Sequence, residues 1–147
     1  MKNRRIDIKL LEPGAYKAMM ALENYGKEVE LNPLLKELIK IRASQINGCA
    51  YCIDMHTEDA LKLGETARRI FALSAWKESH LFSEKEKAIL YITEEVTEIS
   101  KNGLTDETYN KAINTFGEQL TAKIIMLIVT INAWNRIAVS TKKVYKP

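Results

Sequence analysis

The chain has 147 residues, of which 46% are hydrophobic, and its 22 basic and 19 acidic residues leave a formal net charge of +3. A chain of this length can bury roughly two-thirds of the surface that its unfolded form exposes, so we expect one domain covering residues 1–147 that folds without a disulfide framework. Charges of both signs are interleaved along the chain, which excludes the basic stripe of a typical nucleic-acid-binding protein.

The N-terminus and the most apolar stretch predict neither secretion nor a membrane span. Charged residues at positions 2–9 are not followed by the apolar run of a secretory signal. The apolar stretch at 124–139 is interrupted by Thr130, Asn132 and Asn135 and is shorter than the ~20 residues that span a bilayer. We therefore expect a cytoplasmic protein without a membrane partner. In that setting, two cysteines close together suit catalysis or metal binding better than a structural disulfide.

The spacing of apolar residues predicts the fold class. These residues recur at intervals of three and four and rarely alternate, which indicates an all-α fold of about six to seven helices. Pro13 opens the first helix, which ends near Gly26. Asn32 as a cap and Pro33 in the first turn begin the second helix, which ends near residues 47–48.

The next helices are predicted from turn and capping residues. The third helix is expected over about residues 49–63 and the fourth over residues 65–76. Ser83 and Glu86 have the spacing of a capping box, so they open an amphipathic helix that carries apolar residues as far as Ile99.

The last part of the chain holds the most apolar helix. Thr105 caps a sixth helix, and Gly117 separates it from this last one. A helix that is apolar nearly all round must be covered on every side, so we expect other subunits to cover part of it in a homo-oligomer. Its polar residues, Asn132, Asn135 and Arg136, are expected to bond between helices or subunits.

Cys49, Cys52 and His56 form the cluster that indicates chemistry. Cysteines three residues apart and a histidine four further on share one stripe of a helix. At the helix start, free backbone amides and the dipole stabilise a thiolate and lower the thiol pKa from its unperturbed ~8.5. Glu37 lies twelve residues before Cys49, and a tight corner at Gly48 could bring its carboxylate beside the imidazole and keep the imidazole basic. Together these residues predict a redox-active dithiol centre.

The residues alone leave the order of the two thiols open. Dipole strength favours Cys49 as the reactive thiol, whereas His56, one turn beyond Cys52, supplies Cys52 with a base. Zinc would need four ligands, and Glu37 would be an awkward fourth, so we expect neither a metal nor a cofactor. His80 has no partner pattern near it and is expected to be structural.

The arrangement Glu37-x11-Cys49-x2-Cys52-x3-His56 resembles the alkylhydroperoxidase D-like branch of the carboxymuconolactone decarboxylase superfamily. The likeness extends over three stretches, 42–56 (RASQINGCAYCIDMH), 75–86 (AWKESHLFSEKE) and 131–137 (INAWNRI). The resemblance implies an all-helical domain, assembly into trimers or hexamers, and a cysteine pair that cycles between dithiol and disulfide.

The resemblance also implies a role for each residue of the cluster. Cys52 would be the peroxidatic thiol that attacks a small hydroperoxide, and Cys49 the resolving thiol. His56 with Glu37 would be the proton relay. A dithiol electron donor, either a protein or a lipoyl or thioredoxin-like group, would reset the pair.

Ala50 and Tyr51 stand between the two cysteines, where the peroxidase branch of the family has a histidine. This departure predicts reduced peroxidase efficiency and leaves three alternatives to a thiol peroxidase open. One is a thiol-disulfide oxidoreductase or redox sensor that acts on another protein. Another is decarboxylase chemistry on a cyclic lactone acid, which in this superfamily does not rely on a cysteine pair. The third is a non-catalytic oligomeric scaffold, whose thiols would titrate normally.

Overall fold

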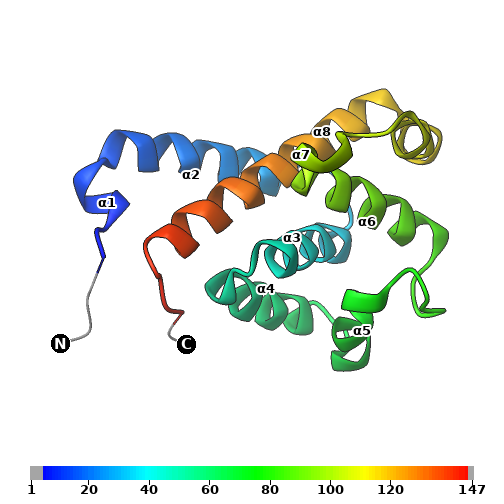
Figure 1. Cartoon of the computed structure of the whole chain (residues 1–147), viewed down its shortest axis with the longest axis horizontal. Coiled ribbons are helices and arrows are strands. Elements are labelled where there is room, and N and C mark those ends of the chain that lie inside the picture. Colours follow the sequence, from blue (N-terminus) through cyan, green and yellow to red (C-terminus); the bar gives the residue numbers. More distant parts are fainter. Residues whose placement is uncertain (1–4, 146–147) are drawn as a thin grey trace.

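The computed structural model describes residues 5–145, so the first charged residues of the N-terminus and the last two residues of the chain lie outside it. Within this described part, the chain forms eight α-helices and one short 3-10 helix and has no strand, which confirms the all-α fold (Figure 1). In chain order, the elements are α1 (Ile8–Leu11), α2 (Pro13–Glu28), α3 (Pro33–Asn47), α4 (Ala50–Lys62), α5 (Ala67–Ala72), the 3-10 helix η1 (Leu73–Ala75), α6 (Glu84–Thr97), α7 (Ile99–Asn102) and α8 (Asp106–Ser140).

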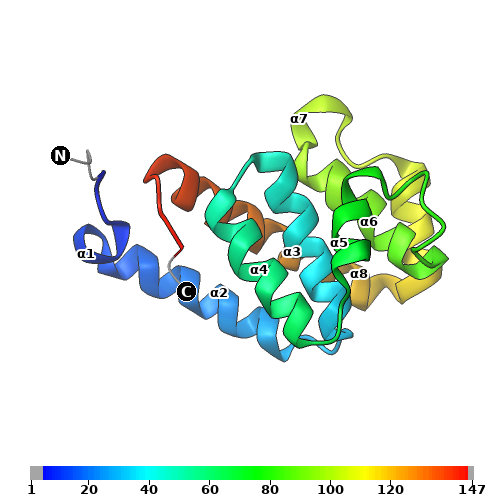
Figure 2. The same ribbon diagram turned by 90° about the horizontal axis from the view of Figure 1, so that it is seen from below.

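The core lies where α3, α6 and α8 meet, and α4 packs against α3 (Figures 1 and 2). Its apolar side chains are almost wholly buried, among them Leu38, Ile39, Ile41, Ile89, Leu90, Ile92, Ile124 and Ile128. Burying one such side chain contributes about 1.5–3 kcal/mol, so the apolar faces of these three helices supply a large part of the stabilising free energy.

Side-chain caps begin two of the core helices at the predicted residues. The side chain of Asn32 accepts a hydrogen bond from the amide of Leu34, and Pro33 occupies the first turn of α3. Ser83 and Glu86 make both hydrogen bonds of the capping box at the start of α6. Each cap satisfies backbone amides that the helix itself leaves unpaired, which is why these starts can be predicted locally.

The segment expected as one fourth helix is shorter and divided, because α5 is followed directly by the 3-10 helix. Thr66 caps α5, and its hydroxyl accepts a hydrogen bond from the amide of Arg69. Glu65, which was expected inside the helix, is buried before it and pairs with Arg69. The tighter winding lets Leu73 and Trp76 both face the core.

Two further differences concern short helices. The backbone leaves the helical region at Glu98 (φ −97°, ψ 40°), so Ile99 begins the separate helix α7 and is 55% exposed. The prediction that Ile99 extends the amphipathic helix was therefore wrong, because an apolar residue at the right interval does not keep the backbone helical. The short helix α1, capped by Asp7, was not predicted, and it buries none of its residues.

Helix α8 is interrupted at Gly117, as predicted. The backbone there has φ 77° and ψ 166°, a conformation that residues other than glycine avoid. The helix is long and apolar enough to cross a membrane by length and composition alone. That is weak evidence, because a core helix passes the same test, and α8 packs against α2, α3, α4 and α6. Part of α8 is nonetheless uncovered, at Met126, Val129 and Val139.

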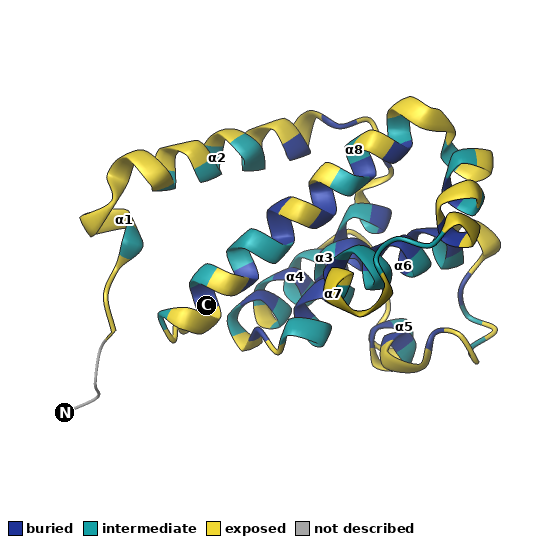
Figure 3. Ribbon diagram, turned by 45° about the horizontal axis from the view of Figure 1, so that its top comes forward, coloured by how far each residue is buried: buried dark blue, intermediate teal, exposed yellow. Residues whose placement is uncertain are grey.

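Helices α1 and α2 form an arm that lies mainly along α8 (Figures 1 and 3). Within these two helices only Gly26 is buried, and a Cβ atom there would come within 3.0 Å of the side chain of Leu127. Trp134 of α8 donates a hydrogen bond to Glu23 at 3.0 Å and packs its ring edge to face against Tyr16. The arm is thus held by a few contacts and not by a core of its own.

Candidate active site

The two cysteines lie at the corner between α3 and α4. Helix α3 ends at Gly48, whose left-handed backbone (φ 65°, ψ 34°) turns the chain sharply. The amide of Cys49 donates a hydrogen bond to the carbonyl of Ser44 at 2.9 Å, and α4 begins at Ala50 with Cys49 as its N-cap. The sulfur of Cys49 accepts a hydrogen bond from the amide of Cys52 at 3.3 Å. The start of α4 therefore favours negative charge on this sulfur.

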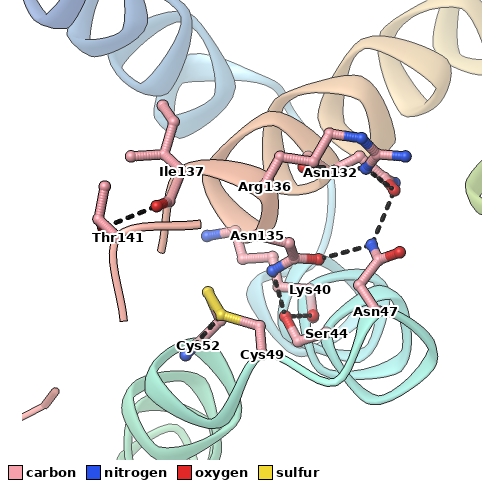
Figure 4. Close-up of a disulfide and its surroundings, with 10 residues drawn as sticks. All are labelled: Lys40, Ser44, Asn47, Cys49, Cys52, Asn132, Asn135, Arg136, Ile137 and Thr141. Atoms are coloured by element: carbon pink, nitrogen blue, oxygen red, sulfur yellow. Dashed lines mark hydrogen bonds between the residues drawn. A yellow bond between two sulfur atoms is a disulfide. The ribbon is translucent and has the colours of Figure 1, made fainter. Parts of the chain in front are cut away.

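Cys49 and Cys52 form a disulfide across the first turn of α4, with their Cα atoms 5.3 Å apart. Such a separation is usual for a disulfide, so the pair can open and close without a large movement of the backbone. Figure 4 shows the pair below the end of α8. Both residues are buried, with 1% and 2% of their surface exposed, and they pack against Ala138 of α8. The C-x-x-C centre is thus present in its oxidised form and shielded from solvent.

Tyr51 packs against the cysteines from the outer side. Its ring meets that of Tyr145 edge to face at 5.7 Å, and the ammonium of Lys143 lies 4.9 Å from the centre of the Tyr51 ring. The hydroxyl of Tyr145 donates a hydrogen bond to Glu58 at 2.8 Å. These contacts hold the segment that follows α8 against α4. Tyr51 therefore serves packing.

Glu37 and His56 meet at the interface of α3 and α4. Nδ1 of His56 lies 2.9 Å from Oε2 of Glu37, and both side chains are buried. Lys40, one turn further along α3, lies 3.3 Å from the other carboxylate oxygen. Burial by itself raises the pKa of Glu37, but the hydrogen bond with His56 and the charge of Lys40 outweigh it and lower the pKa of this carboxyl. Glu37 is therefore held as a carboxylate that orients the imidazole.

The structure does not join this pair directly to the sulfurs. Among residues 5–145, the hydrogen bond at the cysteine sulfurs is the one from the amide of Cys52 to Cys49. His56 lies four residues, about one turn, beyond Cys52 on α4. A cavity of about 20 Å³ borders His56 and Lys40, which is room for one water molecule. Its other lining residues come from α2 and α8, and neither cysteine lines it, so this cavity does not connect the imidazole to the sulfurs. Proton transfer from a cysteine to the imidazole would therefore follow a side-chain movement once the disulfide is reduced.

A second polar cluster joins α3 to α8 beside the disulfide (Figure 4). Asn135, which is fully buried, donates a hydrogen bond to the hydroxyl of Ser44 at 3.0 Å and accepts one from Asn47 at 3.0 Å. Asn47 also donates to Asn132 at 2.9 Å. These bonds confirm that Asn132 and Asn135 connect helices, and they pair amides that burial would otherwise leave unsatisfied. Arg136, expected to do the same, bonds to Asn132 within α8.

Asn132 extends this cluster in two directions. Its amide nitrogen donates to the hydroxyl of Thr97 on α6 at 3.0 Å. Its side-chain oxygen accepts a hydrogen bond from Arg136 at 3.0 Å. Three helices are therefore cross-linked around the cysteine corner by neutral hydrogen-bonding groups, with one guanidinium at the outer edge.

Residues 13–95 match the carboxymuconolactone decarboxylase family. In addition, YdfG of Bacillus subtilis is 42% identical over 138 residues, which cover 94% of either chain. This chain belongs to the carboxymuconolactone decarboxylase family. A solved structure from Agrobacterium tumefaciens, of a protein of unknown function suggested to be the antioxidant defence protein AhpD, is 38% identical, covers 99% of both chains and has a TM-score of 0.94. The debrominase Bmp8 is 18% identical, with coverage of 92% of this chain and 72% of its own and a TM-score of 0.80, which is a likeness of fold alone.

The family match spans α2 to most of α6, and it includes both the cysteine corner and the Glu37–His56 pair. The names decarboxylase and debrominase show that this fold is associated with more than one reaction. Function must therefore be argued from the side chains of this site and not from the name of the carboxymuconolactone decarboxylase family.

In the present chain, one group of side chains has the composition of a metal site. Ligand atoms of Glu37, His56 and Asp59 lie within 4.8 Å of one another. They supply three ligands, and the ammonium of Lys40 already pairs with Glu37, where it opposes a divalent cation. The two sulfurs are bonded to each other and are not available to complete the set. The chemistry of the group fits proton handling better than metal binding.

Sequence reasoning missed Lys40, Ser44 and Asn47. Lys40 and Ser44 follow Glu37 by three and seven residues, so all three share one face of α3, and this spacing was the available signal. Asn47 was noted only as the end of a helix. His80 is exposed in the turn before α6.

Proposed function

We propose that this protein is a thiol peroxidase that reduces small organic hydroperoxides and cycles between a dithiol and a disulfide at Cys49 and Cys52. The observation that carries the proposal is a cysteine pair at a helix start, one turn from a buried carboxylate–imidazole pair. The solved relative from Agrobacterium tumefaciens, suggested to be AhpD, supports the same reaction class.

In the first step, the thiolate of Cys52 attacks the terminal oxygen of the hydroperoxide. The O–O bond breaks, an S–O bond forms, and the alkoxide leaves as an alcohol after it takes a proton from His56. Cys52 becomes a sulfenic acid and is oxidised by two electrons, and the hydroperoxide is reduced by the same two electrons.

In the second step, the thiolate of Cys49 attacks the sulfur of the sulfenic acid. An S–S bond forms, the S–O bond breaks, and hydroxide leaves as water after taking a proton. The amide that bonds to the sulfur of Cys49 stabilises the attacking thiolate. A dithiol donor of protein, lipoyl or thioredoxin-like type then reduces the disulfide and is itself oxidised.

Proton transfer in both steps falls to His56 and Glu37. The carboxylate of Glu37 bonds to Nδ1, so Nε2 is the nitrogen left to exchange protons with the reacting groups, either directly or through water. The negative charge of Glu37 also stabilises the imidazolium that forms when His56 takes a thiol proton.

A thiol-disulfide oxidoreductase or redox sensor is the second candidate. It is favoured by Tyr51, which packs between the cysteines and the C-terminal segment where a peroxidase of this family would have a histidine. In that case the same cysteine pair and relay would exchange electrons with a protein dithiol, and no hydroperoxide would be consumed.

Peroxide consumption by wild type, Cys49→Ser and Cys52→Ser separates these candidates, with cumene hydroperoxide as substrate and dihydrolipoamide as reductant. We expect turnover in wild type only, and in Cys49→Ser a sulfenic acid on Cys52 that dimedone labels. A disulfide that is reduced and re-formed without peroxide consumption would establish the second candidate. Dimedone labelling of Cys49 in the Cys52→Ser variant, with none at Cys52 in Cys49→Ser, would reverse the two roles.

We further propose that the protein works as a homotrimer or homohexamer in the reducing cytoplasm. Leu10 and Leu11 of the arm are 73% and 62% exposed, and Met126 and Val129 of α8 are 36% and 42% exposed. Other copies of the chain would cover this apolar surface. Light scattering should give three or six times the chain mass of 16.8 kDa, and a monomer would overturn the proposal.

A further inference from the structure

A groove near the disulfide carries charges that the reaction described above does not use. It holds about 670 Å³ and lies between the N-terminal segment and the end of α8. We name it the arginine groove, and it is lined by Arg5, Ile6, Ile8, Arg136, Ile137, Ser140 and Thr141. Its volume is in the range of sites that bind small molecules.

The two arginines are oriented by the protein but not neutralised by it. Arg5 donates a hydrogen bond to the carbonyl of Ser140 at 2.8 Å, and Arg136 donates to the carbonyl and the side-chain oxygen of Asn132 at 3.1 and 3.0 Å. All three acceptors are uncharged, and no ion pair joins either guanidinium to a carboxylate within residues 5–145. Each guanidinium has five N–H donors, so donors and the full positive charge stay available to a ligand.

The rest of the arginine groove is mostly apolar, and two of its lining residues neighbour the disulfide. Ile6, Ile8 and Ile137 supply its apolar lining. Ile137 and Thr141 stand among the surroundings of the disulfide (Figure 4), and Ala138, next to Ile137, packs directly on the cysteine pair. The groove therefore combines two positive charges with an apolar lining on residues that neighbour the redox centre, and neither cysteine lines it.

We propose that the arginine groove binds the acid group of the substrate, so that the hydroperoxides this protein takes are amphipathic carboxylates such as fatty acid hydroperoxides. This inference rests on the proposed peroxidase function. A carboxylate matches the fork of a guanidinium and would be held by Arg5 and Arg136, while the alkyl chain covers the isoleucines. The charge and the apolar lining together select this class over uncharged hydroperoxides.

Binding is tested first without any reaction, by titrating the oxidised full chain with dodecanoate below its micelle concentration in a calorimeter. We expect saturable binding, weakened about tenfold in Arg5→Gln and in Arg136→Gln and less than tenfold in Arg136→Lys, which keeps the charge but not the fork. Arg68→Gln is the matched control, because Arg68 is exposed on α5 and does not line the groove. Thermal unfolding of each variant shows whether it is folded. Dodecanoate that binds the double variant Arg5→Gln/Arg136→Gln as tightly as wild type would overturn the inference.

Turnover then separates this inference from the proposed function. We expect linoleic acid hydroperoxide to have a KM about tenfold lower than cumene hydroperoxide, and the Arg136→Gln variant to remove this difference. Equal KM values in wild type, with no dodecanoate binding, would overturn the groove as an acid-binding site and leave the peroxidase intact. No turnover of either hydroperoxide, with dodecanoate still bound at the arginines, would overturn the proposed reaction instead. A third outcome is that wild type does not bind dodecanoate and that the arginine variants change the oligomer mass. This outcome would identify the groove as a contact between copies and would also overturn the inference.

Discussion

Glu37 and Ser44 lie seven residues apart on one face of α3, and each anchors a buried polar cluster of a different kind. Glu37 bonds to two ionisable side chains, His56 at 2.9 Å and Lys40 at 3.3 Å. Ser44 bonds to Asn135 at 3.0 Å through groups that are neutral at every pH where proteins are folded. The first cluster can gain and lose protons, and the second cannot.

This difference indicates two separate tasks beside one cysteine pair. Neutral amides and hydroxyls, once all are paired, hold helices in a single arrangement at a modest energetic cost. Buried charges lose their hydration and are costly unless they are paired, so their retention needs another reason. Our hypothesis is that the Asn135 cluster fixes α8 over the disulfide and that the Glu37 cluster moves protons.

The largest expected effect is on turnover, in the His56→Gln variant. Glutamine keeps a polar side chain but cannot carry a proton, so peroxide turnover should fall about 10²–10⁴-fold. Loss of the hydrogen bond to the buried Glu37 should also lower the free energy of unfolding in urea by about 1–3 kcal/mol. The matched control is His80→Gln, because His80 is exposed and lies outside α3 and α4, the helices that carry the site. Turnover within about fivefold of wild type would exclude His56 from the relay.

The next effect is on stability, in the Asn135→Leu variant. This change leaves Ser44 and Asn47 without one of their partners, so the free energy of unfolding should fall by about 1–3 kcal/mol in urea titrations. The exposed Asn114 lies on the same helix, and Asn114→Leu should stay within about 0.5 kcal/mol of wild type. If Asn135→Leu lost its turnover but none of its stability, the division of tasks between the clusters would be refuted.

A smaller effect is expected on the pH dependence of stability. The pKa of Glu37 in the folded protein lies below its ordinary value of 4.5. The carboxylate's contribution to stability is therefore fully present above that pH and is lost as the pH falls through the folded pKa. Glu37→Gln should flatten the acid side of a plot of unfolding free energy against pH, whereas Asn135→Leu should keep the wild-type slope. Equal slopes in Glu37→Gln and wild type would contradict the assignment of a paired carboxylate.

The smallest effect is expected from Lys40→Met. Lys40 contributes to the lowered pKa of Glu37, so without it the folded pKa lies closer to 4.5, and the acid loss of stability should be smaller and complete at a higher pH. At neutral pH the free energy of unfolding should fall by only about 0.2–1 kcal/mol, because the ammonium is partly exposed. Lys17→Met on the exposed side of the arm is the control, and an identical acid profile in both variants would remove Lys40 from the cluster.

Local signals predicted most of the fold. The intervals of three and four along α3, α6 and α8 indicate helices because one face of a helix repeats at that spacing. Asn32 and Ser83 cap helices, and Gly117 interrupts one, through chemistry confined to a few neighbouring residues. The division of the fourth helix and the end of α6 at Glu98 were not predictable in this way, because the same apolar pattern fits several backbone paths.

The sequence by itself determined the cysteine pair and its location at a helix start. A spacing of three positions lies within one helical turn, and this spacing sets how far apart the two sulfurs can be. Only the tertiary structure decided which partners each remaining side chain meets. The Glu37–His56 contact joins residues 19 apart, the Asn135–Ser44 bond 91 apart, and the Arg5–Ser140 bond in the arginine groove 135 apart. Such contacts depend on how whole helices pack, because the packing of every apolar face together fixes which polar groups are brought within bonding distance.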